Sequence, residues 1–139
     1  NEIDVLSYSF GASQTGSSAY GGGAGAGKVQ FQDFHFVMKM SKATPKLFLA
    51  CANGEHIKSA ILTARKAGKE QQEFYTIKFS DVLVSSYQTS GSGSGDEVPT
   101  EQISFNFSKI ETEYKEQKPD GTLAGGIKAG YDIKINKSV

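Results

Sequence analysis

Apolar and polar side chains alternate in six segments of the chain, and stretches rich in glycine, serine and other turn-forming residues separate these segments. Alternation with a period of two places every second side chain on the same face of a strand, so each segment predicts a β-strand. Recurring strands with turn-rich breaks are typical of an all-β sandwich or barrel rather than of alternating strands and helices. The predicted strands are residues 3–10, 29–40, 57–65, 73–88, 101–114 and 127–136.

The segment 101–114 changes phase in its middle. Its apolar side chains occupy odd positions before Ser108 and even positions after Lys109. A β-bulge inserts one residue into a strand and moves the following side chains to the other face. We therefore expect a bulge near Ser108 and Lys109. The segment 127–136, in contrast, alternates throughout and predicts one uninterrupted strand.

A single helix is predicted in the string TPKLFLACANG, which spans residues 44–54. Thr44 is a good N-cap, Pro45 suits the first helical position, and Asn53 with Gly54 supplies a left-handed stop. A helix of about two turns is too short to be stable alone in water. We expect it to pack on the sheet through its apolar side chains, namely Leu47, Leu49 or Phe48, and Cys51.

The string GGGAGAGKV, residues 21–29, has the look of a phosphate-binding loop, because Gly22, Gly27 and Lys28 occupy the first, sixth and seventh positions of that motif. The motif also needs a serine or threonine after the lysine, to hold a magnesium ion, and a helix that follows. Here Val29 follows, and the next residues predict a strand. The string therefore joins strand to strand, and a nucleotide site is not predicted.

The wider stretch, residues 11–27, is a loop made mainly of glycine, serine and alanine. A loop of this length within a small domain is usually functional or disordered, and its composition alone leaves both interpretations open. Residues 90–96 form a second, shorter stretch of the same kind.

The length of 139 residues predicts one domain, residues 1–139. The 15 basic and 15 acidic residues give a formal net charge of zero, so binding to nucleic acid or to an anionic membrane is not expected, whereas self-association is weakly favoured. The one cysteine, Cys51, cannot form an internal disulfide. No apolar run reaches the length of a membrane span or a signal sequence, which predicts a soluble chain without a signal peptide.

Patterns that would indicate catalysis or metal binding are weak. His35, Cys51 and His56 lack the close paired spacing of a zinc site. The serines are not set in a G-x-S-x-G motif, and neither histidine is placed by the sequence as a base. Carboxylates such as those of Asp33, Asp81, Glu111 and Glu113 alternate with other residues in strands, as on a solvated face. We therefore predict no catalytic residue, no metal and no cofactor.

The chain contains, in this order, the strings IDVLSYSFGASQ, GGGAGAGKVQFQDFHF, TPKLFLACANGEHI, RKAG, DVLVSSYQ, EQISFNFSKIETEY and KAGYDIKIN. They closely resemble the Hcp family, the haemolysin-coregulated proteins that form the inner tube of bacterial type VI secretion systems. The resemblance runs from Asn1 to Val139. Two features differ from the family pattern: Tyr8 and Phe10 stand where family members have tryptophans, and family members begin with a further strand before the position of Asn1.

The resemblance implies a tight β-barrel with one flanking helix, assembled as a hexameric ring, with rings stacking into a tube. It implies other copies of the chain, a VgrG-type spike protein, the contractile sheath and small effector proteins as partners. The tube would assemble in the bacterial cytoplasm and leave the cell through the type VI system when the sheath contracts. The effectors would be held in the lumen, which is a carrier or chaperone role, and no reaction is implied.

The resemblance also implies two sets of site residues. Strand alternation separates Ser9 from Tyr8 and Phe10, whose bulk we expect in the barrel core. In an isolated barrel the Ser9 face would merely meet solvent, but the matching serine of family members lines the lumen, so Ser9 is expected to contact cargo. The loop is expected to contact the neighbouring ring through Gly16, Tyr20, Gly21, Gly22, Gly23, Gly25 and Gly27.

Two alternative functions remain at this point. The first is an enzyme in which a tube module carries a catalytic extension, and it is not expected because the chain ends at Val139, directly after the last predicted strand. The second is a soluble ligand-binding barrel, which would be monomeric and would contain an apolar cavity.

Overall fold

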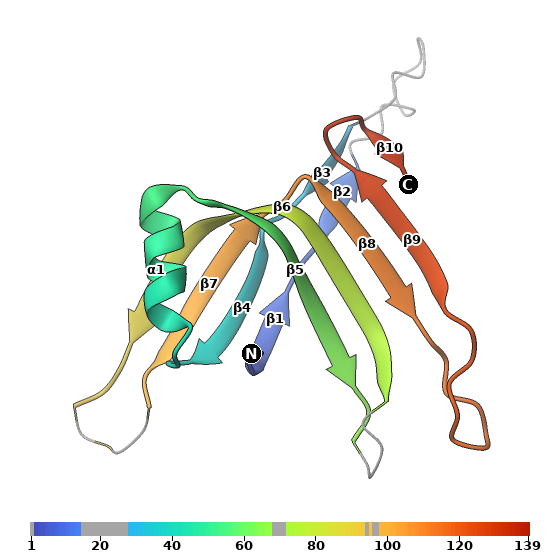
Figure 1. The fold of residues 1–139 in the computed structure, drawn as a ribbon, viewed down its shortest axis with the longest axis horizontal. Helices are drawn as coiled ribbons and strands as arrows, with labels where there is room; N and C mark the ends of the chain where they lie inside the picture. The colour runs from blue at the N-terminus through green and yellow to red at the C-terminus, as the bar shows by residue number, and fades with distance from the viewer. Residues whose placement is uncertain (1, 15–27, 68–71, 94, 96–97) are drawn as a thin grey trace. The chain divides into compact units, whose positions relative to one another are not determined.

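The computed structural model describes residues 2–14, 28–67, 72–93, 95 and 98–139. Within these residues the structure is mostly β with one helix, as the alternating pattern predicts (Figure 1). The elements are β1 (Val5–Ser9), β2 (Ala12–Gln14), β3 (Val29–Phe31), β4 (Phe34–Lys39), α1 (Thr44–Asn53), β5 (His56–Arg65), β6 (Glu73–Ser90), β7 (Thr100–Asn106), β8 (Lys109–Tyr114), β9 (Ile127–Asp132) and β10 (Lys137–Ser138).

The described residues group into two compact units. The first consists of Asn1–His56 with Leu83–Asn106, and the second of Ile57–Val82 with Phe107–Val139. The long strand β6 contributes its first part to the second unit and its last part to the first.

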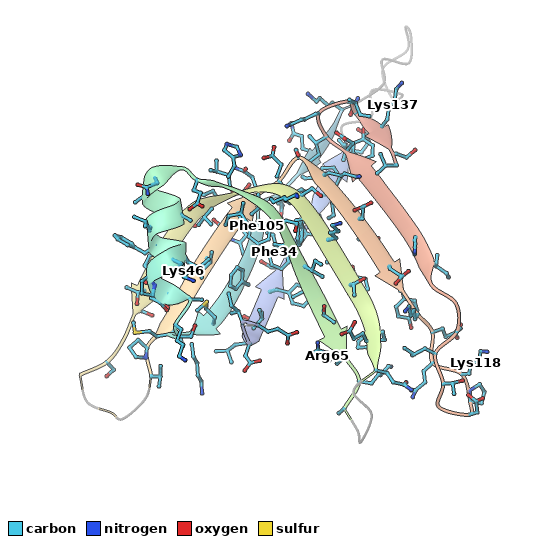
Figure 2. All side chains as sticks on the ribbon, viewed as in Figure 1. Phe34, Lys46, Arg65, Phe105, Lys118 and Lys137 are labelled. Carbon is cyan, nitrogen blue, oxygen red and sulfur yellow. The ribbon has the colours of Figure 1, made fainter. Side chains whose placement is uncertain are left out.

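The first unit contains an antiparallel sheet in the order β1-β4-β7-β6. Alternate side chains of β4 are buried and exposed, so the aromatic residues of this strand point to one face. The rings of Phe34 and Phe105 have centroids 5.0 Å apart, and both lie in the core of this unit (Figure 2). The buried apolar side chains of the unit are Phe34, Phe36, Met38, Ala50, Val84, Ile103 and Phe105.

A two-stranded ribbon, β2 with β3, forms the base of the glycine-rich stretch. The sequence placed Ala12–Gln14 in a loop, but these residues pair antiparallel with Val29–Phe31. The stretch therefore does join strand to strand, as predicted. The predicted strand 29–40 is wrong in one respect, because it is divided into β3 and β4, which pair with different partners. Alternation of apolar and polar side chains predicts an extended segment, but it does not predict where that segment leaves one partner strand and joins another.

The helix α1 ends where the sequence predicts. Gly54 follows the last helical residue with a φ of 64°, a left-handed conformation that suits glycine. The predicted start is wrong by one residue: Thr44 is the first helical residue, and its hydroxyl donates a hydrogen bond to Glu101 instead of capping the helix. Ala43 precedes the helix with helical backbone angles.

The packing of α1 differs in part from the expectation. Ala50 is buried, and Leu47 and Cys51 are half-buried. Phe48 is 56% exposed and Leu49 is 53% exposed, although Phe48 still contacts one aromatic ring of the sheet. The helix therefore carries more apolar surface than a single chain covers.

The second unit contains a sheet in the order β5-β6-β8-β9-β10. Its buried apolar side chains are Ile77, Phe79, Val82, Phe107 and Ile110, and the rings of Phe79 and Phe107 have centroids 4.9 Å apart. The aromatic pair supplies most of the bulk in this core, because aromatic side chains bury large areas.

The predicted irregularity near Ser108 and Lys109 lies at the expected position. It is a break between β7 and β8 rather than a bulge within one strand. The Ser108 N–H donates to the Ser80 carbonyl at 3.0 Å, and the neighbouring Asp81 has a φ of 54°. A left-handed residue in the partner strand disturbs the ladder on both sides, which explains the change of phase.

The predicted strand 127–136 is too long. β9 ends at Asp132, whose carboxylate accepts hydrogen bonds from the backbone N–H groups of Lys134 at 2.9 Å and Ile135 at 3.2 Å. Asn136 has a φ of 55°, and the chain turns back so that β10 pairs with β9. An aspartate that bonds to the backbone two residues later favours a turn, and this preference overrides the alternation.

Candidate functional site

Ser9 is the last residue of β1 and is exposed. It lies opposite His35 in β4, His35 lies opposite Ser104 in β7, and Ser104 lies opposite Ser86 in β6. Residues opposite each other in antiparallel strands have side chains on the same face. The four side chains therefore form one row across the sheet of the first unit.

A second row follows on the same face. Ser7, Val37, Gln102 and Gln88 are opposite one another in the same four strands. The two rows border a shallow hollow of about 420 Å³. Its polar lining consists mainly of hydroxyl and amide groups. The titratable side chains among the lining residues are those of His35 and Tyr8. We name these two rows the neutral face.

A chain of hydroxyl groups connects the inner part of the neutral face. Ser85 donates to Oδ2 of Asp33 at 2.6 Å and lies 2.9 Å from the Ser104 hydroxyl, which also bonds to the Ser86 hydroxyl. A register shift between Val84 and Ser86 lets two successive serines reach the same partner. Sequence reasoning missed this network. The signal that could have found it is the pair of adjacent serines inside the predicted strand 73–88.

The face opposite to Ser9 departs from the expectation that Tyr8 and Phe10 lie in the core. The Tyr8 ring stacks on the buried Phe34 ring at 5.9 Å between centroids, yet Tyr8 is 49% exposed. Phe10 is half-buried and stacks on Phe31 of the ribbon. β1 ends the strand order of this sheet, so only its inner side meets the core. Parity assigned the face correctly, but it could not report that the core stops at an edge strand.

The residues predicted for the ring-stacking loop lie outside the described residues. They are Gly16, Tyr20, Gly21, Gly22, Gly23, Gly25 and Gly27. Their role remains a prediction.

The histidines and the cysteine are not gathered into a metal-binding group. Among the residues that the structure describes, no cluster of three or more His, Cys, Asp or Glu side chains could hold a metal ion. No helix within the described ranges is long and apolar enough to span a membrane.

Large apolar side chains are exposed on both units. In the first unit they lie on β1, on α1 and before β7, and in the second they lie on β5, on β9 and in the turn after it. Single exposed apolar residues are ordinary on a monomer, but groups of them mark surfaces that another molecule covers. Those more than half exposed include Leu6, Phe48, Leu49, Ile61, Val98, Ile127 and Ile135.

Comparison with known proteins defines the class. A family model described as "Type VI secretion system effector, Hcp" matches residues 1–114. The protein Hcp1 of Pseudomonas aeruginosa is 48% identical over 137 residues, which cover 97% of this chain and 84% of that protein. The chain therefore belongs to the Hcp family of type VI secretion proteins.

Solved structures agree with this assignment. A structure of a type six secretion system protein has a TM-score of 0.89 and 29% identity, and covers 97% of this chain and 85% of that chain. Hcp1 from Salmonella typhimurium has a TM-score of 0.79 and 33% identity, covering 100% and 84%. A type VI secretion system effector from Yersinia pestis has a TM-score of 0.75 and 34% identity, covering 95% and 84%. The fold is that of solved Hcp structures.

Proposed function

We propose that this protein is a structural subunit of the type VI inner tube, which forms hexameric rings that stack. It carries small effector proteins in the lumen, and it leaves the cell through the type VI system when the sheath contracts. A VgrG-type spike protein and the contractile sheath are its further partners. The protein is not an enzyme in this proposal, since its role is to assemble and to hold cargo.

The observation that carries the proposal is the exposed apolar surface of the single chain. Phe48 and Leu49 on α1, Ile61 on β5 and Ile127 on β9 are each more than half exposed. Burial of one such side chain contributes about 1.5–3 kcal/mol. A self-associating subunit would cover several of them at once, and the zero net charge removes long-range repulsion between copies.

The neutral face supports the carrier role. Ser9 and its neighbours in the two rows offer hydroxyl and amide groups that both donate and accept hydrogen bonds. Such groups are cheaper to desolvate than charges, so a surface of this kind suits weak contacts with many proteins. Ser9 is proposed to lie on the inner wall of the ring and to contact cargo there.

Light scattering after a sizing column, together with negative-stain imaging, tests the assembly. We expect the mass of a closed ring of six copies and ring-shaped particles. A monomer at every concentration would contradict the proposal, and it would favour a soluble ligand-binding protein instead.

Shortening residues 16–26 tests the proposed stacking loop separately. The shortened chain is expected to keep its thermal unfolding and its ring mass while losing tubes in the images, because the removed residues are mostly glycine, alanine and serine, which have little apolar surface to bury. A shortened chain that fails to form rings would show that the loop belongs to the ring itself.

A further inference from the structure

Glu101 is a carboxylate with no exposed surface. It lies in β7, its side chain is 0% exposed, and it points to the same face as the apolar Ile103 and Phe105. Acidic side chains are almost never fully buried unless they are paired. A buried carboxylate therefore needs a specific partner, and the neighbouring elements supply one.

The partner is the first turn of α1. The Thr44 hydroxyl donates a hydrogen bond to Oε1 of Glu101. The same hydroxyl oxygen accepts a bond from the Ser41 N–H at 3.0 Å, which ties the turn before the helix to the same carboxylate. Figure 1 shows the start of α1 at the end of the sheet where β4 ends and β7 begins. Oε2 has no hydrogen-bond partner among the described residues, so few donors stabilise this carboxylate and each one matters.

The helix lacks the charge that would complement its own N-terminus. Its first turn contains no acidic residue, and Thr44 does not act as a side-chain cap. The N-terminus of a helix carries a partial positive charge from unpaired N–H groups, and an anion nearby stabilises it. Glu101 places a carboxylate at this end from a strand that lies 57 positions later in the sequence.

Tyr87 joins the same cluster from β6. A hydrogen bond with Glu101 is the main reason why the pKa of Tyr87 is raised, followed by burial and by the negative charge of Glu101. The Tyr87 ring also meets the Phe48 ring of α1 edge to face, with centroids 5.7 Å apart. Helix and sheet are thus connected at two places, through the Thr44–Glu101 bond and through the Phe48–Tyr87 contact.

We propose that Glu101 is the tertiary anchor of α1: the carboxylate on β7 accepts a hydrogen bond from the Thr44 side chain, holds the start of the helix on the sheet, and so fixes which side of α1 carries the exposed Phe48 and Leu49. Glu101 is a positioning residue, because it acts through the helix and not by contact with a partner. The inference goes beyond the proposed function, since the contact between α1 and the sheet lies within one chain and exists whether or not rings form.

Hydrogen exchange of residues 44–53 tests this anchor. Thr44→Val keeps the shape of the side chain but removes the donor, and we expect exchange in the helix to accelerate by about tenfold to a hundredfold, the range that one bond to a charged group contributes. Thr44→Ser retains a hydroxyl and should restore the exchange of the parent protein. Thr112→Val is the matched control, because its hydroxyl bonds to the Ala129 carbonyl at 3.3 Å and not to α1, so the change should leave the helix unchanged.

A double-mutant cycle shows whether the effect runs through Glu101. Glu101→Gln preserves the volume and an acceptor but removes the charge, so it should accelerate exchange less than Thr44→Val does. In the double variant the loss of helix stability, obtained from the exchange rates, should be smaller than the sum of the losses in the two single variants, because both changes remove the same contact. Light scattering on each variant confirms that proteins of one assembly state are compared. Unchanged exchange in Thr44→Val, equal acceleration throughout the chain, or strict additivity would each overturn the proposal.

Discussion

The polar sheet faces of the two units are built from different chemistry. The neutral face of the first unit presents hydroxyl and amide groups around Ser9. On the second unit, β6, β8 and β9 border a hollow of about 330 Å³ that is lined by Lys78, Glu111, Glu113 and Lys128 among others. We name these four residues the charged face.

The charged face satisfies much of its own charge. Glu113 lies 3.3 Å from the Lys128 ammonium and 3.8 Å from that of Lys115, and Glu111 lies 3.6 Å from that of Lys109. Exposed ion pairs contribute little stability and weaken with salt. The comparison indicates that hydrogen bonds between hydroxyl groups hold the inner part of the neutral face, whereas ion pairs hold the charged face.

The largest expected effect concerns the cores beneath the two faces. Phe105→Ala in the first unit and Phe79→Ala in the second should each lower the free energy of unfolding by about 3–5 kcal/mol, because each removes a buried ring and leaves a cavity. Denaturant unfolding measures both, with the exposed Lys118→Ala as a control expected within about 0.5 kcal/mol (Figure 2). A loss in only one of the two phenylalanine variants would mean that one core is not packed as described.

A smaller effect is expected inside the neutral face. Ser104 is 3% exposed and bonds to the hydroxyls of Ser85 and Ser86. Ser104→Ala removes the hydroxyl without adding bulk and deprives both serines of their partner, which should lower the free energy of unfolding by about 1–3 kcal/mol. Thr112→Val provides the comparison for an exposed hydroxyl on the other unit, and it should change the same quantity by less than about 0.5 kcal/mol. Equal effects in the two variants would contradict the network.

A substitution in the charged face should lower the free energy of unfolding by less than the change at Ser104 does. Glu113→Gln removes the pairs with Lys115 and Lys128, and the free energy of unfolding should fall by less than about 1 kcal/mol. The difference should shrink further at about 1 M salt, where charges are screened within about 3 Å. A loss above about 2 kcal/mol that does not shrink at high salt would instead show that these pairs act as a buried network.

The contrast also shows what sequence reasoning can reach. Alternation located the long strands of the described part of the chain, and Gly54 marked the end of α1, because both signals are local. The burial of Glu101 departs from the expectation that strand carboxylates lie on a solvated face. Its partner Thr44 could not be predicted either, since only the fold brings together residues so far apart in the chain.

In the candidate site, too, local features were predictable from the sequence and contacts between distant residues were not. The face on which Ser9 lies was predictable from period two, whereas the row that connects it to His35 and Ser104 depends on strand order and register. The turn at Asp132 could have been predicted from its side chain, but the unbroken alternation beyond it indicated a strand. Local preferences that conflict are decided by the hydrogen bonds that the whole fold allows.

The smallest effect on stability is expected at Ser9, and it separates the two faces by function. Ser9→Gln enlarges an exposed polar side chain, so the free energy of unfolding should change by less than about 0.5 kcal/mol and the ring mass should stay the same. Co-purification of an effector should change, because the neutral face presents a different surface. Lys78→Gln, an exposed substitution on the charged face, is the matched control and should leave co-purification unchanged. Loss of the ring in Ser9→Gln would place Ser9 in a packed interface between copies. If Lys78→Gln alone changed co-purification, the cargo contact would lie on the charged face instead. A substitution alters co-purification only when the substituted side chain lies on the surface that binds the cargo.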